Sequence, residues 1–307
     1  MKRFDVLGMG EPLMEFNEVE RGGDRVYLPG HGGDTSNATI AAARQGARCA
    51  YFTAVGEDAF GKDFLALWDR ESVDRAAVIS RGDASTGIYF ITHGPDGHAF
   101  SYYRAGSAAS RVRPSDVPDD LVASARVLHV SGISQAISDT ACDAVFKAIA
   151  VARQAGTSVS YDTNLRLRLW PLDRARAVIH AAVALSDICL PGLDDARQLT
   201  GLERGEDVCA FYLGLGCKVV ALTMGKEGTM VAVPGETRMI PAKVVKAIDA
   251  TGAGDTFDGA FLAEWLANGG DAFAAAAYAN AAAALSTQGY GAVAPIPTRQ
   301  QVAAFMG

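Results

Sequence analysis

The 307-residue sequence lacks any apolar run near the roughly 20 residues that a membrane-spanning helix needs. Glu11 and Glu15 arrive too early for a secretory signal, so we expect a cytoplasmic protein without a membrane partner. Clusters of Lys and Arg are also absent, and the formal net charge is −7. Nucleic-acid-binding chains usually gather basic residues on one face. The composition therefore predicts no nucleic-acid partner.

Paired cysteines are missing as well. The five cysteines are scattered, and none forms a Cys-x-x-Cys pair: Cys49, Cys142, Cys189, Cys209 and Cys217. Disulfide frameworks and zinc sites depend on even numbers or close ligand spacing. We expect reduced, mostly buried thiols and no metal site built from them.

Two familiar nucleotide motifs are missing or incomplete. No Gly-x-x-x-x-Gly-Lys-Ser/Thr sequence occurs, which excludes a P-loop. The stretch Gly8-Met9-Gly10-Glu11-Pro12-Leu13 has two glycines but lacks the third and the following helix of a dinucleotide-binding fingerprint. An NAD-dependent dehydrogenase is therefore disfavoured.

What the chain does contain is an alternation of short apolar runs with longer periodic segments, 49% of its residues being hydrophobic. The runs that predict buried strands are Phe4–Met9, Arg48–Ala54, Val127–Ser131, Ser158–Tyr161, Asp187–Leu190 and Val219–Thr223. The segments that predict helices are Ser36–Gln45, Ser138–Gln154, Leu172–Ala184, Glu206–Leu213, Ala253–Ala267 and Ala272–Ser286. This order predicts an α/β fold with a mainly parallel sheet covered on both faces. With no repeat or linker visible, we expect one domain spanning residues 1–307.

Two segments interrupt this rhythm, at about residues 12–30 and 86–105. The second predicts a hairpin, with arms Ile88–Thr92 and Phe100–Tyr103 around the turn Gly94-Pro95-Asp96-Gly97. A hairpin inserted into an α/β domain can be a surface excursion, a lid or an oligomer contact. We favour a lid because Tyr89, Tyr103 and Arg104 are side chains that often contact ligands.

The strongest chemical signal is Asp249-Ala250-Thr251-Gly252-Ala253-Gly254-Asp255-Thr256-Phe257. Its glycines permit a sharp turn into a helix, so the amides of Gly252, Ala253 and Gly254 can converge on one point with the helix dipole behind them. Such a nest suits the charge on a transferring phosphoryl group. Asp255 then lies where a general base can reach a substrate hydroxyl. Taken alone, the motif favours a glycine-rich helix start with a stabilising Asp.

Two further elements accompany this motif. The stretch Gly30-His31-Gly32-Gly33-Asp34-Thr35-Ser36-Asn37 opens the first long helix. Gly32 and Gly33 allow close approach of a ligand to the backbone, and Asp34 and Asn37 offer hydrogen bonds suited to sugar hydroxyls. The stretch Thr223-Met224-Gly225-Lys226-Glu227-Gly228 follows a strand late in the chain.

The Gly-Gly-Asp-x-x-Asn element and the Asp-x-Thr-Gly-Ala-Gly-Asp element resemble the two signatures of the ribokinase-like (PfkB) carbohydrate kinases in order and separation, over essentially the whole chain. Within that family the chain looks most like the 2-keto-3-deoxygluconate kinases. Three stretches carry this likeness: Tyr102–Ser110, Leu128–Ser134 and Asp162–Trp170. The third departs from the usual Asp-Pro-Asn-Tyr-Arg at Thr163 and Leu165.

The resemblance implies a three-layer α/β/α sandwich with a small β lid, and ATP and Mg²⁺ as cofactors. ATP is implied over the C-terminal half of the sheet, bordered by Thr223, Gly225, Gly228, Gly252 and Gly254, with Asn280 near the adenine. The sugar is implied under the lid, against Gly33, Asn37, Tyr89, Tyr103 and Arg104, with Arg166 opposite. Many members carry Asn-x-x-Glu where this chain has Gly192 and Asp195. Asp195 is thus either a contact to magnesium-bound water or a solvated carboxylate in the first turn of a helix.

Arg104 and Arg166 bear on the choice of substrate. A neutral sugar gives no reason for two guanidinium groups, whereas a sugar acid can form charge-assisted bonds with both. Each could instead belong to a structural ion pair. We expect a kinase that phosphorylates the primary hydroxyl of 2-keto-3-deoxygluconate to 2-keto-3-deoxy-6-phosphogluconate, with Asp255 as base. The alternatives are a kinase of fructose, ribose or 5-keto-2-deoxygluconate, and a non-catalytic sugar- or nucleotide-binding protein. The lid edge predicts a homo-oligomer.

Overall fold

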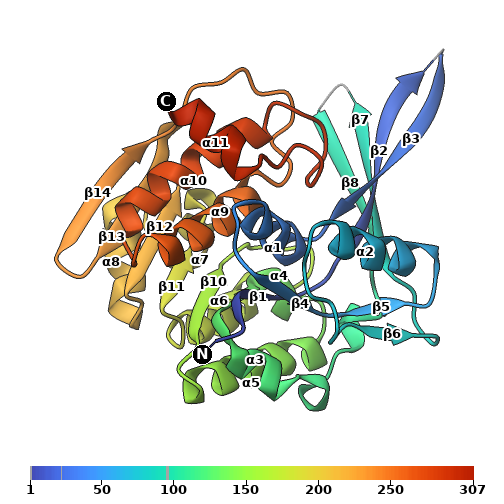
Figure 1. The fold of residues 1–307 in the computed structure, drawn as a ribbon, viewed down its shortest axis with the longest axis horizontal. Helices are drawn as coiled ribbons and strands as arrows, with labels where there is room; N and C mark the ends of the chain where they lie inside the picture. Colours follow the sequence, from blue (N-terminus) through green and yellow to red (C-terminus); the bar gives the residue numbers. More distant parts are fainter. Residues whose placement is uncertain (1, 22, 95–96) are drawn as a thin grey trace.

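The computed structural model describes residues 2–21, 23–94 and 97–307. Its apolar runs form an eight-stranded sheet (Figure 1). In spatial order the strands are β14 (Glu236–Pro241), β13 (Gly228–Val233), β12 (Val219–Thr223), β11 (Ile188–Leu190), β10 (Ser158–Asp162), β9 (Ala125–Ser131), β1 (Phe4–Met9) and β4 (Cys49–Phe52). The six strands from β12 to β4 are parallel, whereas β13 and β14 form an antiparallel edge.

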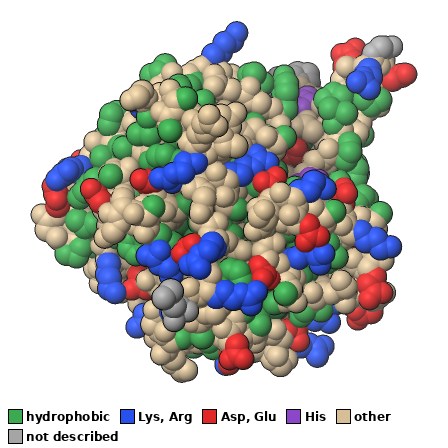
Figure 2. Space-filling model, viewed as in Figure 1, with side chains coloured by type: hydrophobic (Ala, Val, Ile, Leu, Met, Phe, Trp, Pro, Cys, Tyr) green, Lys and Arg blue, Asp and Glu red, His purple; other side chains and the backbone are tan. Residues whose placement is uncertain are grey.

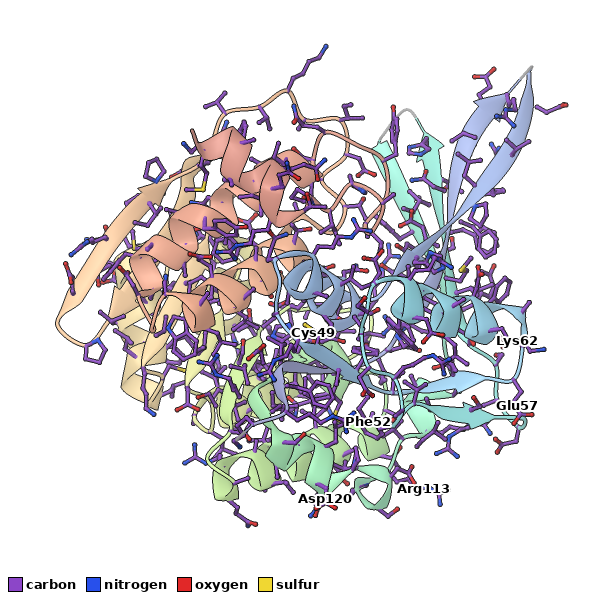
Figure 3. All side chains as sticks on the ribbon, in the orientation of Figure 1. Cys49, Phe52, Glu57, Lys62, Arg113 and Asp120 are labelled. Atoms are coloured by element: carbon purple, nitrogen blue, oxygen red, sulfur yellow. The ribbon has the colours of Figure 1, made fainter. Side chains whose placement is uncertain are left out.

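Alternate residues of each strand enter different cores, because successive side chains point to opposite faces of a sheet. On β1, Leu7 packs into one buried cluster and Val6 into the other. Cys49 and Phe52 on β4 divide in the same way and lie inside the body, whereas Glu57 lies at the rim (Figure 3). Both faces of the sheet are therefore buried, as its parallel strands require.

The helices cover these two faces. One core contains buried residues of α3 (Asp119–Ser124), α5 (Asp139–Gln154), α6 (Leu172–Val183), α7 (Leu193–Thr200) and α8 (Gly205–Leu215). The other contains residues of α1 (Asp34–Arg44), α2 (Ala59–Arg70), α9 (Ala253–Ala267), α10 (Ala272–Ser286) and α11 (Arg299–Met306). The short α4 (Gly132–Ala136) follows β9, and three 3₁₀ turns lie at Ala109–Arg111, Pro114–Asp116 and Gly225–Glu227. The predicted α/β fold with a mainly parallel sheet is confirmed.

A separate four-stranded sheet lies beside this body and projects from it (Figure 1). Its strands, in spatial order, are β3 (Asp24–Gly32), β2 (Leu13–Arg21), β7 (Gly87–Gly94) and β8 (Gly97–Tyr103). The predicted hairpin with arms Ile88–Thr92 and Phe100–Tyr103 is confirmed, since Ile88 pairs with Tyr103 and Ile91 with Phe100. The predicted turn residues Pro95 and Asp96 lie outside the described residues. We call these four strands the lid sheet.

Some predicted boundaries were wrong. The run Arg48–Ala54 is divided between β4 and β5 (Ala54–Gly56), which pairs with β6 (Ile79–Arg81) in a small sheet of its own. Of the helices in the described part of the chain, none has the length and apolar character to cross a membrane.

Candidate active site

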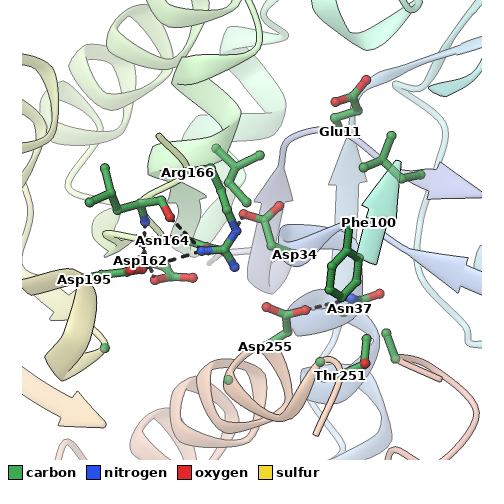
Figure 4. Close-up of a pocket in the computed structure, with 18 of the residues that line it drawn as sticks. Glu11, Asp34, Asn37, Phe100, Asp162, Asn164, Arg166, Asp195, Thr251 and Asp255 are labelled. Atoms are coloured by element: carbon green, nitrogen blue, oxygen red, sulfur yellow. Dashed lines mark hydrogen bonds and ion pairs between the residues drawn. The ribbon is translucent and has the colours of Figure 1, made fainter. Parts of the chain in front are cut away.

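A cavity of about 750 Å³ opens at the carboxyl ends of the parallel strands, between the body and the lid sheet. The segments that follow β1, β9, β10 and β11 contribute to its wall, as do Thr223 at the end of β12 and the start of α9. Ligands bind at this edge of open α/β sheets because the loops there are free to diverge. Figure 4 shows the polar side chains that converge on it.

Asp255 lies in the first turn of α9 and borders this cavity. Its Oδ2 accepts a 2.7 Å hydrogen bond from Nδ2 of Asn37 on α1 (Figure 4). The pKa of Asp255 is raised to about 7, chiefly by burial and also by the nearby Asp34 carboxylate, whereas Asn37 and Arg166 oppose the shift. A carboxyl group with this pKa is suited to remove a proton near neutral pH.

One of the three amides of the predicted nest is already used in a hydrogen bond within the chain. Gly252 and Gly254 line the cavity, and Gly252 has a φ of 73°, which glycine adopts without strain. A Cβ at Gly252 would lie 2.9 Å from the Cβ of Ala292. The amide of Ala253, however, donates to the carbonyl of Ala250 at 3.2 Å, so its N–H is turned into the chain.

Three more carboxyl groups gather around Asp255. Asp34 and Asp162 line the cavity, and Asp258 lies one turn further along α9. Burial raises the pKa values of Asp162 and Asp258 well above their usual range, and neighbouring Asp carboxylates add to the effect. The sequence analysis named Asp34 as a hydrogen-bonding group for a sugar, but it did not name Asp162 or Asp258 as site residues. Asp258 lies three residues after Asp255 on the same helix, whereas only the fold brings Asp162 to this cluster.

The other predicted residues of the first motif also reach the cavity. Gly33 lines it with a φ of 104°, and a Cβ there would lie 2.4 Å from the carbonyl oxygen of Glu11. Asn37 is 3% exposed. Within the described residues, Asn37 Oδ1 and Asp34 Oδ1 are buried without a hydrogen-bond partner. Both residues border the cavity, although these two oxygen atoms are themselves buried.

The lid sheet contributes a different tyrosine from the one predicted. Tyr103 is 66% exposed and lies edge-on to Phe90, outside the cavity lining. Tyr102 and Phe100 line the cavity instead, because alternate residues of β8 share a face. Tyr89 also lines it, and its hydroxyl donates to the buried carboxylate of Glu15. Tyr89 therefore offers the substrate mainly its ring.

Arg104 lines the cavity at the lid end, where its Nε donates a 2.6 Å hydrogen bond to Oε2 of Glu11. Arg166 lies on the opposite side and is about half exposed, with Nη1 3.7 Å from Asp195 Oδ2. Asp195 Oδ2 also accepts the backbone N–H of Leu165 at 2.9 Å. Both predicted guanidinium groups thus reach the cavity, and each has a carboxylate neighbour.

Only part of the predicted nucleotide set borders the cavity. Thr223 does, whereas Gly225, Gly228 and Asn280 lie outside its lining. Gly228 has a structural requirement, since a Cβ would lie 2.1 Å from the carbonyl oxygen of Ile240 on β14. Asn280 accepts from Thr229 at 2.7 Å and donates to Ile240 at 3.1 Å, which ties α10 to β13 and β14.

A protein-built metal cage is not present in the described part of the chain, where no three His, Cys, Asp or Glu side chains are grouped to hold an ion. The carboxylates of Asp162 and Asp195 at the cavity wall nevertheless fit Mg²⁺, which takes oxygen ligands and keeps several waters.

The family comparison fits this geometry. Residues 13–299 match the model of the pfkB family carbohydrate kinases. The chain belongs to this family. It is 36% identical to a 2-dehydro-3-deoxygluconokinase of Thermoproteus tenax, over 85% of this chain and 82% of that protein. A second 2-dehydro-3-deoxygluconokinase, from Bacillus subtilis, is 32% identical over 99% of this chain and 96% of its own length. Fructokinase-1 of Oryza sativa is 30% identical over 98% of this chain and 97% of its own length.

Solved structures of the family give the same fold. A PfkB protein from Polaromonas superposes with a TM-score of 0.88 at 30% identity, covering 98% of this chain and 99% of that one. A fructokinase from Vibrio cholerae with bound fructose, ADP and calcium superposes with a TM-score of 0.89 at 28% identity, covering 99% of both chains. The predicted family and ribokinase-like fold are confirmed, and the protein is a carbohydrate kinase that uses ATP with a divalent metal.

Proposed function

We propose that this kinase phosphorylates the primary hydroxyl of 2-keto-3-deoxygluconate, giving 2-keto-3-deoxy-6-phosphogluconate and ADP. In this proposal residues 1–307 form one kinase domain, and the lid sheet closes over the sugar. The observation that carries it is the position of Asp255, which lies at the start of α9 in a cavity that also contains Arg104 and Arg166.

In the proposed reaction Asp255 takes the proton of the sugar hydroxyl as its oxygen attacks the γ-phosphorus of ATP. The bond between that phosphorus and the β,γ-bridging oxygen breaks, and ADP leaves with the electron pair. The amides at the start of α9, chiefly those of Gly252 and Gly254, bind the charge on the transferring group. When bound, Mg²⁺ supplies neutralisation of the phosphates, and Asp195 can contact its water shell.

In this proposal the remaining predicted residues would bind the nucleotide. The phosphates would lie between Thr223 and Gly252, both of which border the cavity. The ribose and adenine would continue past the segment Met224–Gly228 toward Asn280, outside the cavity lining. Helix N-termini and flanking glycines suit a polyphosphate because backbone N–H groups point at it.

The sugar acid is favoured over a neutral sugar by the two guanidinium groups on opposite sides of the cavity. Arg104 and Arg166 can both reach a bound anion, and charge-assisted hydrogen bonds are roughly twice as strong as neutral ones. The two relatives named 2-dehydro-3-deoxygluconokinase support the same substrate, because 2-dehydro-3-deoxygluconate is another name for 2-keto-3-deoxygluconate.

A fructose kinase is the second candidate. Fructokinase-1 of Oryza sativa matches over nearly the whole chain, and the charge of Arg104 is offset by Glu11. Ribose and 5-keto-2-deoxygluconate are further alternative substrates. A non-catalytic binding protein would have no use for Asp255 beside an unobstructed cavity.

The deciding experiment is a substrate panel. Purified protein is mixed with Mg·ATP and each of 2-keto-3-deoxygluconate, 5-keto-2-deoxygluconate, fructose and ribose, and ADP release is measured. We expect the highest kcat/KM for 2-keto-3-deoxygluconate and a 6-phosphate product, and a preference for 5-keto-2-deoxygluconate would contradict this substrate. A preference for fructose or ribose would contradict the substrate, and sugar binding without ADP release would contradict catalysis.

The lid sheet is also the proposed contact between subunits. Its outer surface exposes Tyr103 and Leu28, and Figure 2 shows hydrophobic side chains beside charged ones on this projection. β3 forms one edge of the sheet and can pair with another strand. Light scattering should give twice the monomer mass or more, and Tyr103→Glu should lower it.

We place the enzyme in the cytoplasm because its five cysteines are all free and buried.

A further inference from the structure

The glycines of the stretch Gly8–Leu13 have a packing role. A Cβ at Gly8 would lie 2.0 Å from Oγ1 of Thr39, and one at Gly10 would lie 2.2 Å from Oγ1 of Thr35. Both threonines belong to α1, so these glycines let that helix lie directly on β1. This packing accounts for the two glycines of the incomplete dinucleotide motif. It does not explain Glu11, the charged residue that follows them.

Glu11 is a carboxylate buried at the wall of the cavity. It is 1% exposed and lines the cavity beside Leu13. Burial raises its pKa, whereas Arg104 and Ser107 oppose the shift. Removing a carboxylate from water is strongly unfavourable unless the charge is paired, so the partners of Glu11 determine what it does.

Those partners all belong to the segment that leaves the lid sheet. Oε2 of Glu11 accepts Nε of Arg104 at 2.6 Å and is also ion-paired with its Nη2, while the hydroxyl of Ser107 donates to Oε1. The neighbouring strand leaves room for this group, since a Cβ at Gly87 would lie 2.9 Å from Glu11 Oε1. The Glu11 carboxylate therefore joins the end of β1 to the end of β8.

The contact fixes the direction of the guanidinium. Glu11 holds the edge that contains Nε and Nη2, so the remaining Nη1 corner is directed away from the carboxylate. The side chain of Arg104 is 10% exposed and lines the cavity, and its guanidinium carbon lies 5.8 Å from the ring centre of Tyr102. A guanidinium held on one edge and packed against a ring presents its other donors in a defined direction.

We infer that Glu11 is a positioning residue that determines specificity, holding Arg104 toward the substrate so that this guanidinium acts as an oriented donor rather than a mobile cation. This inference rests on the proposed recognition of a sugar acid, because the group that Arg104 receives is the substrate carboxylate. Selectivity for the acid then depends on the Glu11–Arg104 pair and not on Arg104 alone.

A double-mutant cycle tests this role. Glu11→Gln keeps the size and one acceptor oxygen but removes the charge, Arg104→Met removes the guanidinium, and the double variant removes both. KM and kcat are measured for each with the sugar that the wild type prefers. We expect Glu11→Gln to raise KM for the keto acid about tenfold, the size of one weakened charge-assisted bond, with kcat changed less than threefold. In the Arg104→Met background the same change should alter KM less than twofold.

A KM increase from Glu11→Gln that persists in the Arg104→Met background would overturn the inference, and so would an unchanged KM in the wild-type background. Glu11→Asp keeps the charge but is one methylene shorter, and it should give an intermediate KM; this variant decides the matter if Glu11→Gln does not fold. The substrate panel on the wild type is independent of the cycle. If that panel selects a neutral sugar, the proposed substrate fails, and the cycle on that sugar still shows whether Glu11 acts through Arg104.

Discussion

The side-chain amide of Asn37 donates a 2.7 Å hydrogen bond to Asp255, although the two residues are 218 positions apart in the chain. The bond joins α1 to α9, the helices that carry the two signature motifs. It holds one carboxylate oxygen of Asp255, and in the proposed reaction the other oxygen receives the proton of the substrate hydroxyl. Burial raises the pKa of Asp255, and the hydrogen bond from Asn37 opposes that increase.

The pH dependence of the reaction follows from Asp255. A general base must be ionised, and burial raises the pKa of this carboxyl to about 7. We therefore expect kcat/KM to fall as pH drops below about 7, by tenfold per unit, and to level off above it. Initial rates from pH 5 to 9 in buffers of constant ionic strength provide the measurement. A flat profile down to pH 5 would contradict the assignment.

Replacing Asn37 should move this profile in a known direction. Asn37→Ala removes a hydrogen bond that favours the ionised form of Asp255, so the pKa seen in kcat/KM should rise above the wild-type value. Asn37→Asp adds a second carboxylate and should raise it further. KM for the sugar should rise in both variants, because Asn37 lines the cavity. An unchanged or lower kinetic pKa would show that the bond is not formed in solution.

Arg166 and Arg168 should differ in what they do for the substrate. Arg166→Ala removes a cation from the cavity and should raise KM for the keto acid tenfold or more, the loss expected for a charge-assisted bond, while changing KM for fructose less than twofold. Arg168 donates a 2.8 Å hydrogen bond to the carbonyl of Phe100 on the lid sheet. Arg168→Ala should therefore raise KM severalfold for acid and neutral sugars alike.

The exposed Arg174, which is paired with Asp139, provides the matched control for both variants. Arg174→Ala should change neither KM. Equal losses on the acid and on fructose in Arg166→Ala would contradict a carboxylate contact.

Buried carboxyl groups should also make stability depend on pH. Burial raises the folded-state pKa of Asp258 above its unfolded value, and the nearby His129, with a pKa lowered to about 4, is neutral and does not offset the charge. Stability from this group is complete below the unfolded pKa and is lost as pH rises through the folded pKa. Asp258→Asn should therefore raise the unfolding temperature at pH 8 by about 2 °C or more relative to its effect at pH 5. An equal shift at both pH values would contradict this account.

Much of the fold was predictable because its signals are local. β1, β12, α9 and α10 were predicted with the boundaries that the structure shows, since each is a short apolar run or a long Ala-rich segment between clear turns. By contrast α2 and α7 were not predicted. Both carry more polar residues than α9 and α10, so neither stands out as an apolar run. The buried positions of α2, Gly61, Phe64, Leu67 and Trp68, do recur at helical spacing, so its pattern was present in the sequence and was missed.

The site was predictable only where a motif carried it. Asp255 and Asn37 belong to signatures, and the structure brings both into one cavity. Glu11 lies outside both signatures, in the segment that follows β1, and only the fold brings it to the cavity. Asp258 follows the second signature on α9, three residues after Asp255. Tyr103 was chosen over Tyr102 although adjacent strand residues face opposite ways, because the register of β8 against the cavity was not available from sequence.

The measurement that tests the central claim most directly is the turnover of Asp255→Asn. This change keeps the side-chain shape and an oxygen that can still accept from Asn37, but it removes the basic carboxylate. We expect kcat with Mg·ATP and 2-keto-3-deoxygluconate to fall by about 10²- to 10⁴-fold, while sugar and nucleotide dissociation constants measured by calorimetry change less than fivefold. A kcat within about tenfold of wild type, with binding intact, would show that Asp255 is not the base.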